Sequence, residues 1–179
     1  MEDREMIRRI QNGQKEYLNQ IAEKYYNDIY YFCCYQTGSR EDAYDLAQDT
    51  FLRFIRYVDN YKYQNLKGYL LTIAMNLCRN HIREKALTPD GQDRLLVRKE
   101  PACTDISDSH TEHSLLLADA LRRLPDVQRE AVLLHHFYGY KNREIARMTG
   151  ASYAAVKSRV KQGLTKLQNL LNEEDFYEQ

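Results

Sequence analysis

The sequence predicts an all-α protein made of two small helical domains that are joined by a flexible linker. Only seven Gly and three Pro occur among 179 residues, and apolar residues recur at steps of three and four rather than alternating as in strands. This periodicity stops between residues 86 and 112, where six acidic residues stand against three basic ones. Such a stretch is longer than the loops that compact domains usually contain. We therefore expect domains at 1–85 and 113–172, a linker at 86–112 and an acidic tail at 173–179.

The composition argues against several classes of function. No apolar run approaches the roughly 20 residues of a membrane span, and the first ten residues lack a signal-peptide core, so we expect a soluble cytoplasmic protein. The four cysteines form no CxxC pair and are expected to be reduced. The histidine pairs at 110/113 and 135/136 lack further ligands at metal-binding spacing. We expect no metal, no cofactor, no catalytic residue and no small-molecule substrate.

Four helices are expected in the first domain, at residues 4–11, 16–36, 40–59 and 67–85. Asn12-Gly13 is a turn dipeptide, and Thr37-Gly38-Ser39 breaks the helical pattern before acidic residues that suit a helix N-terminus. Eleven of the fifteen tyrosines lie before residue 86. We expect them to build the first core, with their hydroxyls at its surface.

The helix at 40–59 carries an apolar residue on its polar side. Helical periodicity predicts a core stripe of Ala47, Phe51, Phe54, Ile55 and Val58. On the other face Leu52 stands among polar residues, namely Asp45, Gln48, Asp49 and Arg56. A single exposed leucine needs no functional explanation. The alternative is a docking surface, in which Leu52 is the apolar anchor and the carboxylates meet basic groups of a partner.

The helix at 67–85 presents a polar column at steps of four, three and four residues. Its members are Thr72, Asn76, Arg79 and Arg83. Such a column is most often a solvated helix face. The alternative is that amide and guanidinium groups beside the aromatic connection YKYQNLKGY hold a nucleic-acid strand and capture an unstacked base. The residues alone leave both interpretations open.

In the second domain, helical periodicity resumes at residue 113, and Pro125 suits the first turn of a further helix. Residues 140–171 then predict two helices joined by a tight turn, since Gly150 can end the first in a left-handed conformation and Ser152 can cap the second. The apolar stripe of the second helix consists of Val156, Val160, Leu164, Leu167 and Leu171. This pattern predicts a helix-turn-helix, or winged-helix-like, domain.

The polar side of this last helix is cationic and free of carboxylates. It holds Lys157, Ser158, Lys161, Gln162 and Thr165, with Arg159 and Lys166 at its edge. Residues 113–172 contain ten Lys and Arg against four Asp and Glu, a net charge of +6 inside a chain that is neutral overall. A solvated bundle helix would explain the pattern. The charge favours a recognition helix that enters a DNA major groove while flanking cations hold phosphates.

Longer stretches resemble the extracytoplasmic-function (ECF) group of bacterial sigma factors, within the sigma-70 family. Their promoter-binding C-terminal domain is similar to LPDVQREAVLLHHFYGYKNREIARMTGASYAAVKSRVKQGLTKL, and their N-terminal domain is similar to DAYDLAQDTFLRFIRYV and GYLLTIAMNLCRNHIREK. The resemblance covers nearly the whole chain. At two positions this chain differs from the residues that the family often has. Tyr69 stands in place of tryptophan, and Asn80 stands in place of aspartate.

The resemblance implies a transcription initiation factor, not an enzyme, that directs core RNA polymerase to promoters through their −10 and −35 elements. The polymerase-binding segment, for the beta-prime and beta subunits, would comprise Asp45, Leu46, Gln48, Asp49, Phe51 and Leu52. The −10 DNA would meet Asn60, Lys67, Asn76, Arg79, Asn80 and Arg83. The −35 DNA would meet Arg143, Lys157, Ser158, Arg159, Lys161 and Gln162. Such factors are commonly inhibited by an anti-sigma factor, so a partner of that kind is implied as well.

Two other functions compete with this one. A stand-alone helix-turn-helix regulator would explain the second domain, but it leaves Leu52 and the polar column without a role, and such regulators usually dimerise. A small enzyme would need a base, a nucleophile and an orienting partner, and no such constellation is visible in the sequence. Binding to core polymerase would separate the first alternative from a sigma factor.

Overall fold

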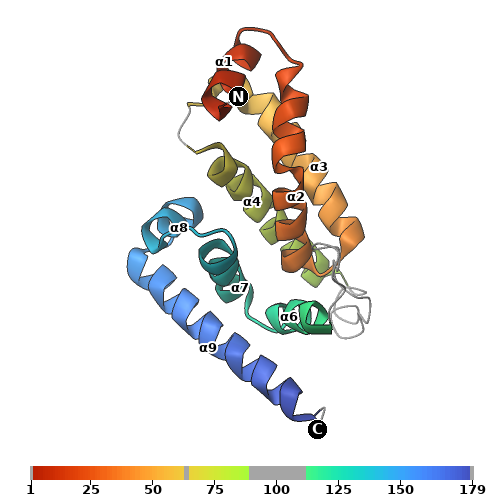
Figure 1. Cartoon of the computed structure of the whole chain (residues 1–179), viewed down its shortest axis with the longest axis vertical. Coiled ribbons are helices and arrows are strands. Elements are labelled where there is room, and N and C mark those ends of the chain that lie inside the picture. The colour runs from red at the N-terminus through yellow and green to blue at the C-terminus, as the bar shows by residue number, and fades with distance from the viewer. Residues whose placement is uncertain (1, 63–64, 89–111, 178–179) are drawn as a thin grey trace. The chain divides into compact units, whose positions relative to one another are not determined.

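A computed structural model describes residues 2–62, 65–88 and 112–177, and all regular elements in these ranges are helical (Figure 1). They are α1 (Asp3–Gln11), α2 (Tyr17–Thr37), α3 (Arg40–Tyr57), the 3-10 turn η1 (Val58–Asn60), α4 (Leu66–Leu87), α6 (Glu112–Arg122), α7 (Asp126–Val132), the π-helix η2 (Leu133–Phe137), α8 (Asn142–Thr149) and α9 (Tyr153–Tyr177). The all-α prediction is confirmed. Within the described ranges, no helix is both long and apolar enough to cross a membrane.

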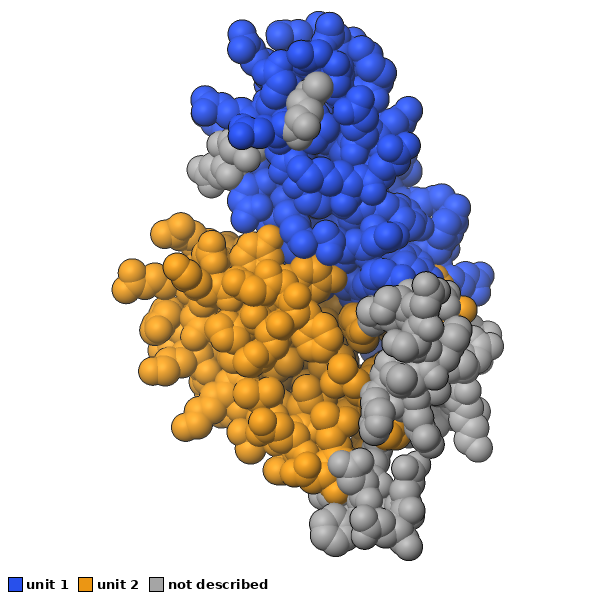
Figure 2. Space-filling view, viewed as in Figure 1, with its two compact units in different colours: residues 1–33, 41–98 blue, residues 34–40, 99–179 orange. Residues whose placement is uncertain are grey.

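The chain divides into two compact units, which Figure 2 distinguishes by colour. Residues 1–33 and 41–98 form the first unit, and residues 34–40 and 99–179 form the second. The grouping of residues 34–40 with the second unit has no counterpart in the sequence pattern, which places the whole second helix in the first domain. Most of the predicted linker lies outside the described residues.

The core of the first unit forms where α2, α3 and α4 meet. Phe32, Phe54 and Met75 are buried, one from each helix. At one end, the carboxylate of Asp42 in the first turn of α3 accepts a hydrogen bond from Lys85 Nζ near the end of α4. His81 Nε2 lies 3.3 Å from the same carboxylate oxygen, without the alignment of a hydrogen bond. The pair therefore ties the start of α3 to the last turns of α4.

The predicted core stripe of α3 is right except at one residue. Ala47, Phe51, Phe54 and Val58 are buried, as expected. The prediction for Ile55 is wrong, because 44% of the surface of this residue is exposed. It lies about 40° further round the helix than Phe51, beyond the margin of the buried face. Thr50 is buried instead, with its hydroxyl donating to the Leu46 carbonyl at 2.7 Å.

The tyrosines of the first domain only partly enter the core. Tyr25 is buried, whereas Tyr26 and Tyr30 of α2 are half-buried, with their rings stacked at 5.9 Å between centroids. Tyr44 and Tyr57 of α3 are exposed. The apolar centre is made mainly by aliphatic side chains and phenylalanines.

The expectation of reduced cysteines is wrong for Cys34, which is disulfide-bonded. Cys33 and Cys78 are free and buried. A hydrogen bond with Cys78, together with burial, raises the pKa of the Cys33 thiol well above its usual range. The Cys33 thiol is therefore protonated, and both cysteines are packing residues of the first unit.

In the second unit, α9 packs against α6, α7 and α8. Val156, Val160 and Leu167 of its predicted apolar stripe are buried. Gly150 ends α8 with a φ of 72°, and the Ser152 hydroxyl accepts a hydrogen bond from the Ala155 amide at 3.1 Å. Both predictions about this turn are confirmed. The helix-turn-helix has no β wing within the described ranges, and α9 continues to Tyr177 rather than stopping at residue 172.

Candidate nucleic-acid and protein interfaces

The exposed face of α3 carries an apolar centre surrounded by polar side chains. Leu52 is 62% exposed, which confirms the prediction from periodicity. Asp49 and Asp45, three and seven residues before it on the same side of α3, are also exposed. Ile55, three residues after Leu52, extends the apolar area along the helix. We call Leu52, Ile55, Asp45, Gln48 and Asp49 the α3 face.

Two residues of the predicted polymerase-binding segment are not on this face. Leu46 and Phe51 are only 6% and 9% exposed. Phe51 stacks on Tyr26 of α2 with 6.3 Å between the ring centroids. They therefore hold α3 in the core while their neighbours Asp45 and Leu52 point outward. The sequence missed Ile55 as a surface residue, and its signal was only a position at the edge of the buried stripe.

Two tyrosines lie near Phe51, the residue before Leu52 in α3: Tyr26 stacks on Phe51, and Tyr44 is close enough to affect Tyr26. Tyr44 of α3 is exposed, and Tyr26 is half-buried. Burial, with smaller effects from Tyr44 and Tyr30, raises the pKa of Tyr26. Its hydroxyl therefore stays protonated and can donate a hydrogen bond to a partner at neutral pH.

The polar column of α4 is exposed at two of its four members. Asn76 and Arg83 are exposed, as is Asn80 beside them. Thr72 and Arg79 are half-buried, and the Thr72 hydroxyl donates to the Gly68 carbonyl at 2.7 Å. The surface open to a ligand thus consists of two amides and one guanidinium, which can bind both phosphates and base edges.

The connection between η1 and α4 has a well-defined packing at both ends. Asn60 is exposed, whereas Lys67 forms an ion pair with Asp28 of α2 at 2.9 Å. Tyr61 packs its ring on Tyr69 at 4.7 Å, and Tyr69 in turn contacts Phe54. Tyr69, which stands in place of the tryptophan common in the family, therefore serves as a packing residue between α3 and the connection.

In the second unit, most of the predicted −35 residues share the exposed side of α9. Lys157, Ser158, Lys161 and Gln162 are exposed, and Arg159 is half-buried at the edge of this side. The Gln162 carbonyl oxygen accepts a hydrogen bond from Gln128 of α7 at 3.3 Å, which orients its amide. Arg143 is exposed in the first turn of α8.

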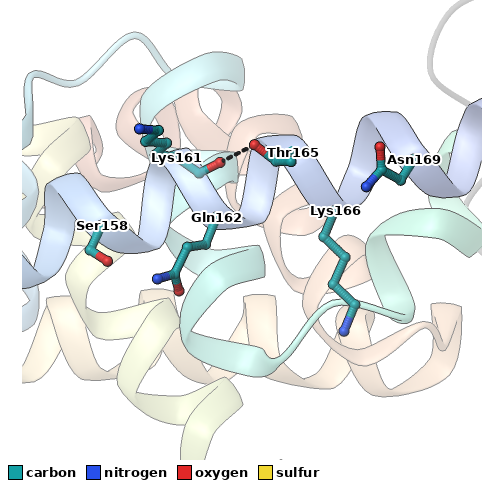
Figure 3. A pocket seen from close by; sticks show the side chains of 6 residues that line it. All are labelled: Ser158, Lys161, Gln162, Thr165, Lys166 and Asn169. Carbon is teal, nitrogen blue, oxygen red and sulfur yellow. Dashed lines mark hydrogen bonds between the residues drawn. The ribbon is translucent and has the colours of Figure 1, made fainter.

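A shallow groove of about 540 Å³ follows α9 further toward its C-terminus (Figure 3). It is lined by Ser158, Lys161, Gln162, Thr165, Lys166 and Asn169. The Thr165 hydroxyl donates to the Lys161 carbonyl at 2.9 Å, which leaves its oxygen free to accept. The groove contains two ammonium groups and no carboxylate. It therefore extends the cationic side of α9 beyond the predicted residues, to Lys166 and Asn169.

Comparisons with known proteins decide the family. Sequence models of two family regions match the chain, Sigma-70 region 2 over residues 21–88 and Sigma-70, region 4 over residues 114–167. The ECF RNA polymerase sigma factor EcfG of Rhodopseudomonas palustris (strain TIE-1) is 33% identical over 147 residues, which cover 78% of this chain and 78% of EcfG. This chain belongs to the ECF RNA polymerase sigma factors.

A further relative and a solved structure support this family assignment. BldN of Streptomyces coelicolor, also an ECF sigma factor, is 29% identical over 174 residues, and the match covers 93% of this chain but only 65% of BldN. The sigma factor RpoE from Bartonella quintana, crystallised with the anti-sigma factor NepR, superposes with a TM-score of 0.72 at 25% identity. That match covers 88% of this chain and 98% of RpoE.

The family membership gives the two units their general task. Sigma factors are transcription initiation factors that bind core RNA polymerase and promoter DNA, and they are not enzymes. The resemblance derived from the sequence is confirmed. The residues that make each contact remain to be assigned, and the surfaces described above supply the candidates.

Proposed function

We propose that this ECF sigma factor docks on core RNA polymerase through the α3 face and reads promoters with α4 and α9. The observation that carries the docking site is the exposure of Leu52 and Ile55 within a ring of acidic and amide groups. An apolar anchor surrounded by charge is the usual build of a binding hot spot. The acidic residues, Asp45 and Asp49, suit a basic surface on the beta-prime or beta subunit.

The docking site can be tested by co-elution of the purified chain with core polymerase. We expect Leu52→Asp to abolish co-elution, because it replaces the apolar anchor by a charge that would be buried in the complex. The fold should survive, since Leu52 is exposed. Leu87→Asp is the matched control, because Leu87 is an exposed leucine of the first unit outside the α3 face. If both variants co-elute like the wild type, the assignment is wrong.

The same experiment addresses the competing function. A wild-type chain that binds promoter duplex tightly but never co-elutes with core polymerase would behave as a stand-alone regulator. In that case the α3 face would need another partner.

For the −10 element we propose Asn76, Asn80 and Arg83 as the direct contacts, with Arg79, Asn60 and Lys67 beside them. The exposed amides and guanidinium of α4 supply donors for phosphates and base edges. Asn80, where relatives often carry aspartate, can donate as well as accept a hydrogen bond, so we expect it to influence the preferred sequence.

For the −35 element we propose that Lys157, Ser158 and Lys161 reach base edges, while Arg143, Arg159 and Gln162 hold phosphates. All but Arg159 are exposed. Arg143 lies on α8, and the side of α9 that the other five share carries no carboxylate. The groove beside Lys166 can accept the continuing DNA backbone.

The two classes of −35 contact give different signatures. We expect Lys157→Ala to relax specificity at one −35 position by about 1–3 kcal/mol, and Arg159→Ala to weaken all sequences alike. Arg159→Ala should also reduce the slope of log affinity against log salt by about 0.9. Binding of polymerase holoenzyme to a panel of −35 variants at several salt concentrations measures both. A uniform loss with Lys157→Ala would contradict its role in base recognition.

We also propose that the chain acts in the cytoplasm, where its polymerase and promoters are found, and that an anti-sigma factor regulates it. The Bartonella quintana relative was crystallised with such an inhibitor. An extract of the source cells should then inhibit transcription by the reconstituted holoenzyme, and an excess of the Leu52→Asp chain, which should not form holoenzyme itself, should relieve the inhibition. Extracts without any such activity, under all growth conditions tried, would contradict the proposal.

A further inference from the structure

Gln11, the last residue of α1, makes two long-range hydrogen bonds that the sequence pattern does not predict. Its Nε2 donates to the Val58 carbonyl and to the Tyr61 carbonyl, both at 2.9 Å. A carboxamide nitrogen carries two hydrogens, so each one serves a different carbonyl. The side chain is otherwise exposed and covers no part of the core. Its contacts therefore point to a role in holding the backbone of residues 58–61.

These two carbonyls define the start of the connection that leads to α4. The Tyr61 amide donates to the Val58 carbonyl at 3.1 Å, so that η1 closes at Tyr61, the second residue held by Gln11. The Tyr61 ring packs on Tyr69 in the first turn of α4. The connection is thus fixed at its start by one backbone clamp and one ring contact.

The far end of the connection is fixed separately. The Asn65 side chain caps α4 by accepting a hydrogen bond from the Gly68 amide at 3.0 Å. Gly68 leaves little room there, because a Cβ on it would lie 3.2 Å from the Asn65 side chain. Tyr61 and Asn65 are only four positions apart. Gln11 holds the backbone at the first of these residues, and the Asn65 cap fixes the second.

We propose that Gln11 is a positioning residue for −10 recognition, acting through the backbone at Val58 and Tyr61. The inference rests on the proposed −10 function of α4 and the connection before it. It adds a part of the chain that the family match does not include, because Sigma-70 region 2 is matched only from residue 21. In this arrangement α1 is not merely a cover for the core. It holds the backbone at Val58 and Tyr61, from which the chain leads to the −10-binding helix α4.

The test compares isosteric and donor-retaining variants in the reconstituted polymerase holoenzyme. Gln11→Glu keeps the shape but replaces the donor by a carboxylate, which repels both carbonyl oxygens. We expect it to reduce discrimination between cognate and substituted −10 sequences about three- to tenfold, the equivalent of one or two ordinary hydrogen bonds. Gln11→Lys, whose ammonium can donate to both carbonyls, should restore most of the discrimination. Gln14→Glu, at an exposed neighbour, is the matched control.

The outcomes separate this inference from the function on which it rests. Co-elution with core polymerase and discrimination at −35 should be the same for all four chains. Unchanged −10 discrimination in Gln11→Glu, or an equal loss in Gln14→Glu, would overturn the role of Gln11. A wild-type holoenzyme that does not discriminate −10 sequences at all would overturn the proposed −10 function instead.

Discussion

Asp42 is the residue whose ionisation the fold changes most clearly. Burial acts to raise the pKa of its carboxyl, but the hydrogen bond from Lys85 and the nearby His81 outweigh it and lower the pKa to about 2. Since this pKa is below the unfolded value of 3.8, the ionised carboxylate stabilises the fold above about pH 4. This stabilisation is lost as the pH falls from about 4 toward 2.

The Asp42→Asn variant tests this contribution. At pH 7 we expect its free energy of unfolding to be about 1 kcal/mol lower than that of the wild type, a value that allows for solvent screening at this partly exposed site. The difference should shrink as the pH falls from 4 to 2. Urea unfolding at several pH values measures it, with Asp45→Asn, an exposed carboxylate on the same helix, as the control. A difference that stays constant down to pH 2 would show that the ion pair is not its cause.

For single residues, the sequence predicted burial or exposure correctly where the side chain lies near the middle of a helix face. Leu52 lies opposite the core stripe of α3, so its exposure follows from helical geometry alone. Ile55 lies at the margin, where the packing of α2 rather than periodicity decides burial. The contacts of Gln11 could not be predicted at all, because they join residues 47 and 50 positions apart through an exposed side chain.

At the scale of elements, capping chemistry made one helix–helix turn predictable. The turn between α8 and α9 was predictable because Gly150 has positive φ and Ser152 caps the next helix. The π-helix η2 was not, since the Tyr138 amide bonds the Leu133 carbonyl five residues back and no residue type marks that pattern. The late end of α9 was missed because the acidic tail suggested fraying, whereas the helix continues to Tyr177.

At Gly163, α9 lies close against α7. A Cβ at this position would lie 2.7 Å from Val132 Cγ2 and 3.1 Å from the Gln128 carbonyl oxygen. In an isolated helix, replacing glycine by alanine stabilises by about 1 kcal/mol. Here we expect Gly163→Ala to destabilise the second unit by about 1–2 kcal/mol, because the overpacking outweighs that gain.

Chemical denaturation of the full chain, followed by a probe in the second unit, measures the effect of Gly163→Ala. Gln168→Ala, on the exposed side of the same helix, is the control and should change stability by less than about 0.5 kcal/mol. A more stable Gly163→Ala chain would mean that α7 moves aside without cost. Because Gln128 also orients Gln162, the variant should weaken −35 binding as well.

At the scale of the whole molecule, the neutral net charge conceals a strong separation of charge. Residues 1–85 carry a net +1 and residues 113–172 a net +6, whereas the linker at 86–112 carries −3 and the tail at 173–179 carries −4. The basic charge lies in the segment that includes the exposed cationic side of α9. The acidic charge that balances it lies directly before and after residues 113–172 in the chain. This layout could be predicted from the sequence because it needs no fold, only the domain boundaries.

The acidic tail should therefore weaken the attraction of the free chain to DNA of any sequence. The tail is neutralised, and the net charge of the chain becomes +4, in the variant Glu173→Gln, Glu174→Gln, Asp175→Asn, Glu178→Gln. We expect this variant to bind random duplex roughly two- to tenfold more tightly at low salt, because the cations of α9 lose an adjacent negative charge. The gain should disappear at high salt, where the Debye length falls to about 3 Å.

A matched variant distinguishes the position of the charge from its total. It neutralises four exposed acidic residues of the first unit, namely Glu2, Glu16, Glu23 and Glu84. Both variants have the same net charge, so equal gains in affinity would show that only the total matters and would contradict the role of the tail. Fluorescence anisotropy of labelled random duplex across a salt series gives both values. A larger gain for the tail variant would mean that the tail lowers non-specific binding through its position at the end of α9. Selection of promoters would then depend on the holoenzyme.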